Sequence, residues 1–263
     1  MEWSLYAGVG AIAGVLAGLL GLGGGLIIVP LLLYVFTATG LPAVHVQHLA
    51  LGTSMATIMF TSISSFLAHH RRGAVNWAAV RLVAPGLVIG TFGGTWVAAR
   101  LPTGLLKGLF VVFLCYVAVQ MLMDIRPKPS RALPGRGGMS AVGLGIGLIS
   151  SLVGIGGGTM SVPFLAWCNE PVRRAVGTSS AIGFPIAVAG AAGYLVNGWH
   201  APGLPPGAVG FVYLPALAGV AAVSVLTAPL GARLAHRLPV ERLKRFFAVF
   251  LLAVAAHMAM SLR

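Results

Sequence analysis

Charged side chains are scarce in this sequence: Asp, Glu, Lys and Arg together make up 8% of its 263 residues. A soluble domain carries roughly 25% charged residues, so the composition excludes an ordinary soluble fold. Hydrophobic residues account for 58% of the chain, and its mean hydropathy is +0.96. The apolar runs are long and do not alternate with polar residues. They therefore predict membrane-spanning helices rather than the strands of a barrel.

Acidic residues are the rarest charged type, and the four that occur are Glu2, Asp124, Glu170 and Glu241. All four are expected at helix ends or in loops, which argues against a carboxylate relay for cations or protons inside the membrane. The two cysteines, Cys115 and Cys168, are far apart and form neither a disulfide framework nor a metal-binding pattern. No hydrolase, zinc or phosphate-loop motif occurs. We therefore predict no enzyme activity, no metal and no cofactor.

Basic residues give the chain a net charge of +13. In a soluble protein this charge would suggest nucleic acid as a partner. In a membrane protein it indicates basic loops that face anionic lipid and the cytoplasm, with an added attraction for anions. We therefore expect a lipid bilayer and a small anion as partners, and no nucleic acid. The sequence leaves the oligomeric state open, and a homodimer is one arrangement that it allows.

The chain carries one short pattern twice. Gly-Leu-Gly-Gly-Gly at 21–25 precedes Pro30, and Gly-Ile-Gly-Gly-Gly at 154–158 precedes Pro163 at the same spacing. Gly-Thr-Ser follows each pattern, at 52–54 and at 177–179. Apolar segments are expected at about 4–37, 47–69, 77–99 and 104–123, and again at 139–167, 176–196, 208–233 and 242–262. Landmarks in the same order indicate a duplication, with repeats at 1–123 and 139–263 and a basic cytoplasmic connector at 124–138.

The positions of the basic residues predict how the repeats are oriented. If each glycine-broken segment crossed the membrane fully, the Lys and Arg residues would divide almost evenly between the two sides. If each is a re-entrant hairpin, 14 of the 17 fall on one side, as the positive-inside rule requires. Each repeat then has three full spans and one hairpin, an odd count that makes the repeats inverted. The predicted fold is thus an all-α integral membrane protein of two inverted repeats, each with a glycine-broken, re-entrant helix pair and three transmembrane helices.

The glycine runs are the first candidates for a binding site. A glycine run ends a helix and leaves backbone N–H groups free at the start of the next one, where an anion can bind. In a membrane such backbone is tolerated where it is buried in protein or lines a wet cavity. We predict that the two runs meet and bind substrate through Gly23, Gly24, Gly25, Gly156, Gly157 and Gly158. The alternative is that the small residues only let helices pack closely.

Hydroxyl groups beside the glycine runs are the second candidates. Thr53, Ser54, Thr178 and Ser179 could donate hydrogen bonds to an oxyanion. The alternative is that each hydroxyl bonds to a carbonyl one turn earlier in its own helix, which is common in membrane helices. His48 and Arg173, which align in the two repeats, could attract an anion at the mouth of the path. The alternative for such residues is a position in a loop at the membrane interface.

At these residues the sequence resembles the sulfite exporter TauE/SafE family of membrane anion transporters. The matching stretches are the two glycine runs with their prolines, the segments 50–54 and 174–179, and the segments 72–77 and 193–199. The resemblance covers essentially the whole chain. It implies a multi-pass protein of the bacterial cytoplasmic membrane that moves sulfur-containing anions such as sulfite or organosulfonates, usually outward.

Two hypotheses of function follow. The first is a secondary transporter, an exporter by the resemblance, in which a small sulfur-containing anion is held near the midplane between the two glycine-broken helices. The second is a membrane subunit that anchors or assembles a partner protein and transports nothing. The second hypothesis gives the doubled glycine runs no role.

Overall fold

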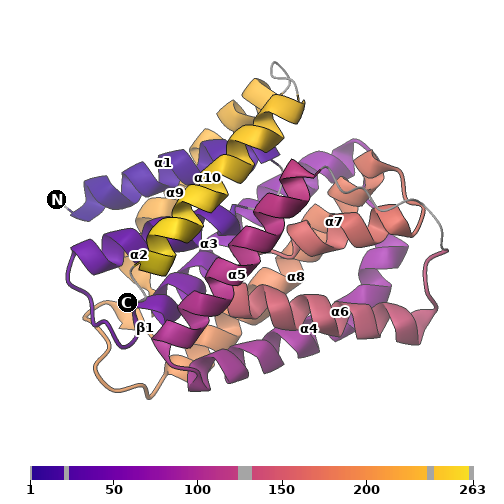
Figure 1. Cartoon of the computed structure of the whole chain (residues 1–263). Helices are drawn as coiled ribbons and strands as arrows, with labels where there is room; N and C mark the ends of the chain where they lie inside the picture. The colour runs from indigo at the N-terminus through magenta and orange to yellow at the C-terminus, as the bar shows by residue number, and fades with distance from the viewer. Residues whose placement is uncertain (1, 21–23, 124–131, 236–239, 261–263) are drawn as a thin grey trace.

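The computed structural model describes residues 2–20, 24–123, 132–235 and 240–260, and within them the chain is almost entirely helical (Figure 1). The first half contains α1 (Glu2–Leu20), α2 (Gly25–Ala38), α3 (Val46–Arg71), α4 (Trp77–Arg100) and α5 (Thr103–Leu122). The second half contains α6 (Arg136–Val153), α7 (Gly158–Trp167), α8 (Val172–Gly198), β1 (Ala208–Val209), β2 (Val212–Tyr213), α9 (Leu214–Ala235) and α10 (Val240–Met260). The predicted all-α class is confirmed, and a helix boundary falls at each glycine run.

Five of the described helices are long and apolar enough to cross a membrane: α3, α4, α5, α6 and α8. Shorter apolar stretches lie in α1, α2, α9 and α10. Among the described residues, the buried polar side chains are those of Ser, Thr, Gln47 and His48, with no buried Asp, Glu, Lys or Arg. This distribution is expected for helices that lie in hydrocarbon. The chain is therefore a multi-pass membrane protein.

The chain reverses direction between α1 and α2. The ring of Tyr6, early in α1, packs edge-on against that of Phe36, late in α2, with centroids 6.4 Å apart. The start of α1 and the end of α2 therefore lie together, and α1 and α2 run antiparallel (Figure 1). This is the shape that a re-entrant hairpin requires. Because α6 has the length of a full span, the orientation of the hairpins in the bilayer, and with it the inversion of the repeats, stays a prediction.

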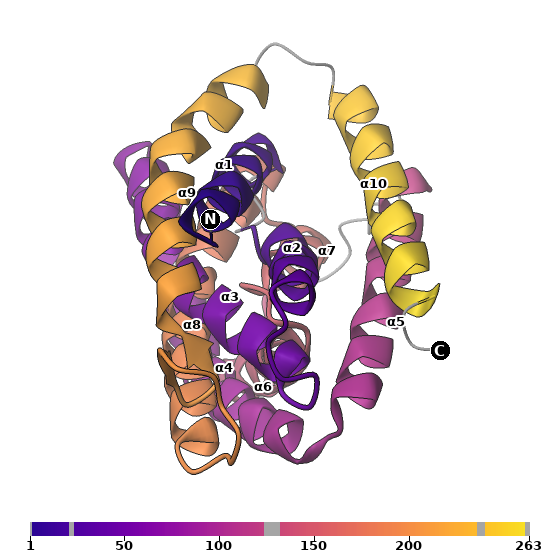
Figure 2. The ribbon, with the colours of Figure 1, turned by 90° about the vertical axis from the view of Figure 1, so that its left-hand side faces the viewer.

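Helices of one half pack against helices of the other half in matching pairs. Helix α1 packs along α9, and α6, which follows the connector, packs along α4. Helix α3 packs on α8 and α5 on α10, and Figure 2 shows the second pair on one side of the molecule and α1 with α9 on the other. Each of these contacts joins a helix of one predicted repeat to a helix of the other. The two halves consequently share one interior.

Glycines allow the close approach of these helix pairs. A Cβ on Gly14 would lie 2.6 Å from the carbonyl oxygen of Ser224, and Gly86 and Gly90 abut the backbone of α6 in the same way. Contact of this kind between small residues is how helices associate tightly in membranes. For these glycines, which lie outside the two runs, close packing is a sufficient explanation.

The predicted segment 208–233 is not helical throughout. Residues 208–213 form a short antiparallel hairpin in which Ala208 pairs with Tyr213 and Val209 with Val212, and α9 begins only at Leu214. Gly207 and Gly210 have φ angles of 87° and 55°, which favour a turn over a helix. The segment was predicted as helix because it is apolar. The side chains of Phe211, Val212 and Tyr213 are instead buried in the core.

Candidate functional site

The two glycine runs end in the same backbone conformation. Gly24 precedes α2 with φ 77°, and Gly157 precedes α7 with φ 73°, so both residues are in the left-handed region. A side chain in that region costs about 1–2 kcal/mol. Glycine is therefore required at both positions for the sharp turn into the helix. The carbonyl of Gly24 accepts from the N–H groups of Ile27 and Ile28, which starts α2 directly after the turn.

The runs also meet in space, as the sequence predicts. A Cβ on Gly25 would lie 2.7 Å from the carbonyl oxygen of Gly154 and 2.8 Å from the Cα of Ile155. The side chain of Ile58 in α3 lies against both runs, since it would be 2.9 Å from a Cβ on Gly25 and 3.1 Å from one on Gly156. We call this region the glycine junction: Gly24 and Gly25, Gly154 to Gly158, and the α3 residues Ser54 and Ile58.

Each predicted serine reaches from its helix to the second glycine run or to α7. Ser54 Oγ donates to the carbonyl of Gly154 at 2.9 Å. Ser179 Oγ lies 2.6 Å from Ser161 Oγ, which in turn donates to the carbonyl of Gly157 at 2.8 Å. These contacts show that the second repeat's glycine run is held from both α3 and α8. The alternative of bonding within the same helix is not what these two serines do.

The two predicted threonines serve as acceptors that hold the start of a helix in the other repeat. Thr53 Oγ1 accepts from the N–H of Tyr213, just before α9, at 2.9 Å. Thr178 Oγ1 accepts from the N–H of Asn76, just before α4, at 2.8 Å. Both N–H groups belong to the residue just before a helix, and in both cases a buried hydroxyl accepts from it. In each half the threonine of the Gly-Thr-Ser segment therefore holds the chain where it enters a helix of the other half.

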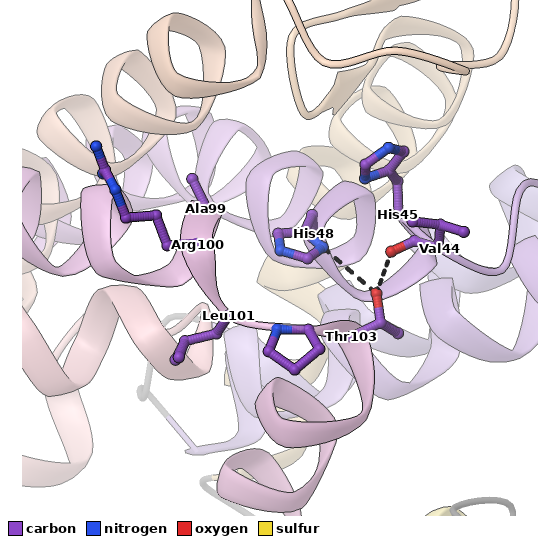
Figure 3. Close-up of a pocket in the computed structure, with 8 residues that line it drawn as sticks. Val44, His45, His48, Ala99, Arg100, Leu101 and Thr103 are labelled. Atoms are coloured by element: carbon purple, nitrogen blue, oxygen red, sulfur yellow. Dashed lines mark hydrogen bonds between the residues drawn. The ribbon is translucent and has the colours of Figure 1, made fainter.

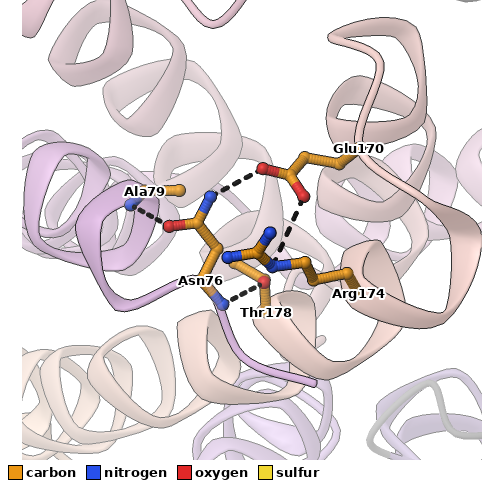
Figure 4. A network of polar contacts seen from close by, with 5 residues as sticks. All are labelled: Asn76, Ala79, Glu170, Arg174 and Thr178. Atoms are coloured by element: carbon orange, nitrogen blue, oxygen red, sulfur yellow. Dashed lines mark hydrogen bonds and ion pairs between the residues drawn. The ribbon is translucent and has the colours of Figure 1, made fainter. Parts of the chain in front are cut away.

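Asn76 is the centre of a polar network at the start of α4 (Figure 4). Its side-chain oxygen accepts from the N–H of Ala79, so it is the N-cap of α4. Its Nδ2 donates to Glu170 Oε1 at 2.6 Å, and Glu170 Oε2 lies 3.8 Å from Arg174 Nε. One of the few acids of the chain thus ties the loop after α7 to α4.

The remaining predicted site residues divide between the junction and the periphery. Gly156 and Gly158 are buried within the junction. Gly23 lies outside the described residues. His48 is buried near the start of α3, six residues or about 9 Å of helix from Ser54. Arg173 is exposed at the start of α8 and makes no part of the junction.

His48 lines a pocket of about 410 Å³ (Figure 3). Its Nε2 lies 3.1 Å from the carbonyl oxygen of Ala98, and its Nδ1 lies 3.5 Å from Thr103 Oγ1, which donates to the carbonyl of Val44. The guanidinium of Arg100, at the rim, lies 3.5 Å above the ring of Trp96. The pocket is lined by Val44, His45, His48, Ala99, Arg100, Leu101, Pro102 and Thr103. The basic side chains in this lining, His45, His48 and Arg100, could attract an anion from solution.

Sequence reasoning missed two kinds of group. The first are the backbone N–H groups that donate to Thr53 and Thr178, and the second are the hydroxyls nearest the second glycine run. Tyr213 and Asn76 act through backbone N–H groups, which leave no signal in the residue type. Ser150 and Thr159 flank the second glycine run, and the aligned positions in the first repeat carry Ala17 and Leu26. That difference between the repeats was the available signal. A search for matching landmarks passes over such differences.

Broken helices that meet inside a bundle of membrane helices are a recurring feature of membrane transporters. The comparison of sequences agrees: residues 6–258 match the sulfite exporter TauE/SafE family. The chain belongs to this family. It is a multi-pass membrane transporter of the bacterial cytoplasmic membrane that acts on a small substrate, and its relatives are named as transporters rather than enzymes.

Several relatives cover most of the chain. A "Probable membrane transporter protein" of Haemophilus influenzae is 39% identical over 252 residues, which is 95% of this chain and 95% of that protein. One from Methanocaldococcus jannaschii is 29% identical, over 90% of this chain and 87% of its own length. YunE of Bacillus subtilis, with the same description, is 28% identical, over 79% of this chain and 85% of its own length. No solved structure matches the chain.

Proposed function

We propose that this transporter moves a small sulfur-containing anion, such as sulfite or an organosulfonate, outward across the cytoplasmic membrane. The substrate class and the direction follow from the description of the family, a sulfite exporter. The proposed binding site is the glycine junction. The observation that carries this assignment is the contact of Gly25 with Gly154 and Ile155, which brings the start of α2 to the segment that leads into α7.

Helix starts supply the positive potential in this proposal. The first residues of α2 and α7 have N–H groups without intrahelical acceptors, and each helix N-terminus carries a partial positive charge. Glycine adds no side chain of its own over these groups, which favours the approach of an anion to the backbone. Because no Lys or Arg is fully buried among the described residues, neutral donors would hold the anion. Ser54 and Ser179 hold the segment 154–161 that contains the start of α7, whereas Thr53 and Thr178 hold the starts of α9 and α4.

In this proposal, alternating access makes use of the contacts between helices of the two halves. In this proposal the repeats rock about the glycine junction, which opens it first to one side of the membrane and then to the other. Movement of one half carries the starts of α4 and α9, because Thr178 and Thr53 bind the residue before each of them from the opposite half. The His48 pocket would collect anions at one mouth of the path.

The test compares two glycines with the same backbone conformation. Gly157 has φ 73° and is buried at the junction, whereas Gly40 has φ 75° and lies in an exposed loop with open space where a Cβ would stand. In proteoliposomes, Gly157→Leu is expected to lower sulfite and methanesulfonate flux at least about tenfold. Gly40→Leu is expected to retain flux, since it shares the strain but not the location. Wild-type flux in inserted Gly157→Leu, or no sulfur-anion flux in the wild-type protein, would contradict the proposal.

A further inference from the structure

The two halves of the glycine junction differ in polarity. With Pro30 and Pro163 aligned, the second repeat carries Ser150, Thr159 and Ser161 where the first carries Ala17, Leu26 and Ile28. The last residue before each helix has the same backbone conformation in both halves, with Gly24 and Gly157 at nearly equal φ. The two glycine-broken helix pairs therefore differ chemically, with these three hydroxyl groups on the pair of the second half.

Two of these hydroxyls are buried and unsatisfied. Within the part of the chain that the structure describes, Ser150 Oγ and Thr159 Oγ1 have no hydrogen-bond partner, and the exposed fractions of these residues are 0% and 9%. Ser150 Oγ lies 3.4 Å from the position of a Cβ on Gly157, beside the turn into α7. Thr159 is the second residue of α7. Leaving a buried hydroxyl unsatisfied is costly, so a ligand or water that accepts from it is expected.

The backbone at the same place offers further donors. Met160 and Ser161 donate to the carbonyl of Gly157, which leaves the N–H groups of Gly158 and Thr159 without an intrahelical acceptor. Ser161 and Ser179 are not free in the same way, because they bond to each other at 2.6 Å. The start of α7 therefore combines two hydroxyl donors with two amide donors, and no cation is among them.

We propose that the start of α7, with Ser150 and Thr159, binds the head group of the substrate, and that this head group is a monoanion with three terminal oxygens, such as a sulfonate. Four donors suit an XO3 group better than a carboxylate, which presents two oxygens. A helix N-terminus carries only about half a positive charge, so a dianion such as sulfate is more costly to bury here than a monoanion. This inference rests on the proposed function and adds to it the side on which the anion binds and the charge that it carries.

The experiment measures anion-dependent thermal stabilisation of the purified full-length protein with methanesulfonate, acetate and sulfate. The wild-type protein is expected to be stabilised at lower concentrations of methanesulfonate than of acetate or sulfate. Ser150→Ala combined with Thr159→Val is expected to raise the half-saturating methanesulfonate concentration about tenfold or more. Thr159→Ser keeps the hydroxyl and is expected to behave as wild type.

A matched control replaces two buried hydroxyls that bond within their own helix. Thr61 and Ser62 donate to Ile58 and Met59 in α3, and Thr61→Val with Ser62→Ala is expected to leave the methanesulfonate dependence unchanged. If the Ser150 and Thr159 double variant does not fold, Ser150→Ala alone is expected to raise the half-saturating concentration about threefold.

The outcomes separate this inference from the proposed function. If the Ser150 and Thr159 variants bind methanesulfonate as wild type does, the hydroxyls hold only water and the inference is wrong. It is also wrong if acetate or sulfate stabilises the wild-type protein as well as methanesulfonate does. Both results leave the proposed function intact, provided that sulfur-anion flux remains sensitive to Gly157→Leu. Loss of that flux sensitivity would overturn the proposed function itself.

Discussion

Ser54 Oγ donates a hydrogen bond of 2.9 Å to the carbonyl of Gly154, a residue 100 positions later in the chain. Both residues are buried. The bond joins α3 of the first half to the glycine run of the second, and it satisfies a carbonyl at a point where the α-helical pattern ends. One short side chain thus fixes the position of the turn at which two broken helices meet.

Removal of this bond is expected to destabilise the protein. Ser54→Ala leaves the Gly154 carbonyl without that donor, and we expect a loss of about 1–2 kcal/mol in unfolding free energy. Ser64, an exposed residue of the same helix that donates to Thr61, is the control, and Ser64→Ala is expected to change stability by less than about 0.5 kcal/mol. Thermal unfolding in detergent measures both. Equal stability of the two variants would contradict the role assigned to Ser54.

Two helical glycines should respond oppositely to alanine. A Cβ on Gly25 would overlap the backbone of Gly154 and Ile155, and Gly25→Ala is expected to cost about 1–3 kcal/mol. Gly8, in α1, has nothing within 4 Å of the position of its Cβ, so Gly8→Ala is expected to be neutral or stabilising by up to about 1 kcal/mol. Thermal unfolding decides between them. If Gly25→Ala were as stable as Gly8→Ala, the close contact of the glycine runs would be wrong.

The Asn76 network is expected to depend on its hydrogen bonds more than on its ion pair. Asn76→Ala removes the N-cap of α4 and the bond to Glu170, and we expect a cost of about 1–2 kcal/mol. The side chain of Arg174 is 51% exposed and its Nε is 3.8 Å from Glu170, so Arg174→Ala is expected to cost less than about 0.5 kcal/mol. Unfolding measurements at low and high salt test this order. A larger, salt-sensitive loss for Arg174→Ala would reverse it.

The hairpin at the first glycine run predicts the sidedness of its ends. In a variant without Cys115 and Cys168, cysteines introduced at Trp3 and at Thr39 are expected to react with a membrane-impermeant reagent from the same side. A cysteine at Arg173 is expected to react from the opposite side. Labelling of positions 3 and 39 from opposite sides would mean that the broken segment crosses the membrane fully, and the repeats would then not be inverted.

The sequence predicted the class of fold, because composition and the length of apolar runs are properties of the chain that need no tertiary information. It also predicted that the two glycine runs meet, which the contact between Gly25 and Gly154 confirms. The helix boundaries at those runs follow from the backbone freedom of glycine, seen in the φ angles of Gly24 and Gly157. It was wrong about residues 208–213, where apolar content alone does not distinguish a buried hairpin from a helix.

Only the tertiary structure decided what each polar group bonds to. Thr53 and Thr178 were predicted as donors to a ligand, which stays a prediction, and only the structure shows that their oxygens also accept from the backbone N–H groups of Tyr213 and Asn76. A hydroxyl can donate, accept or bond within its own helix, and packing between distant segments selects among these. Residue type and spacing therefore determined that the helices break and where, whereas the unsatisfied hydroxyls of Ser150 and Thr159 became visible only once their surroundings were in place.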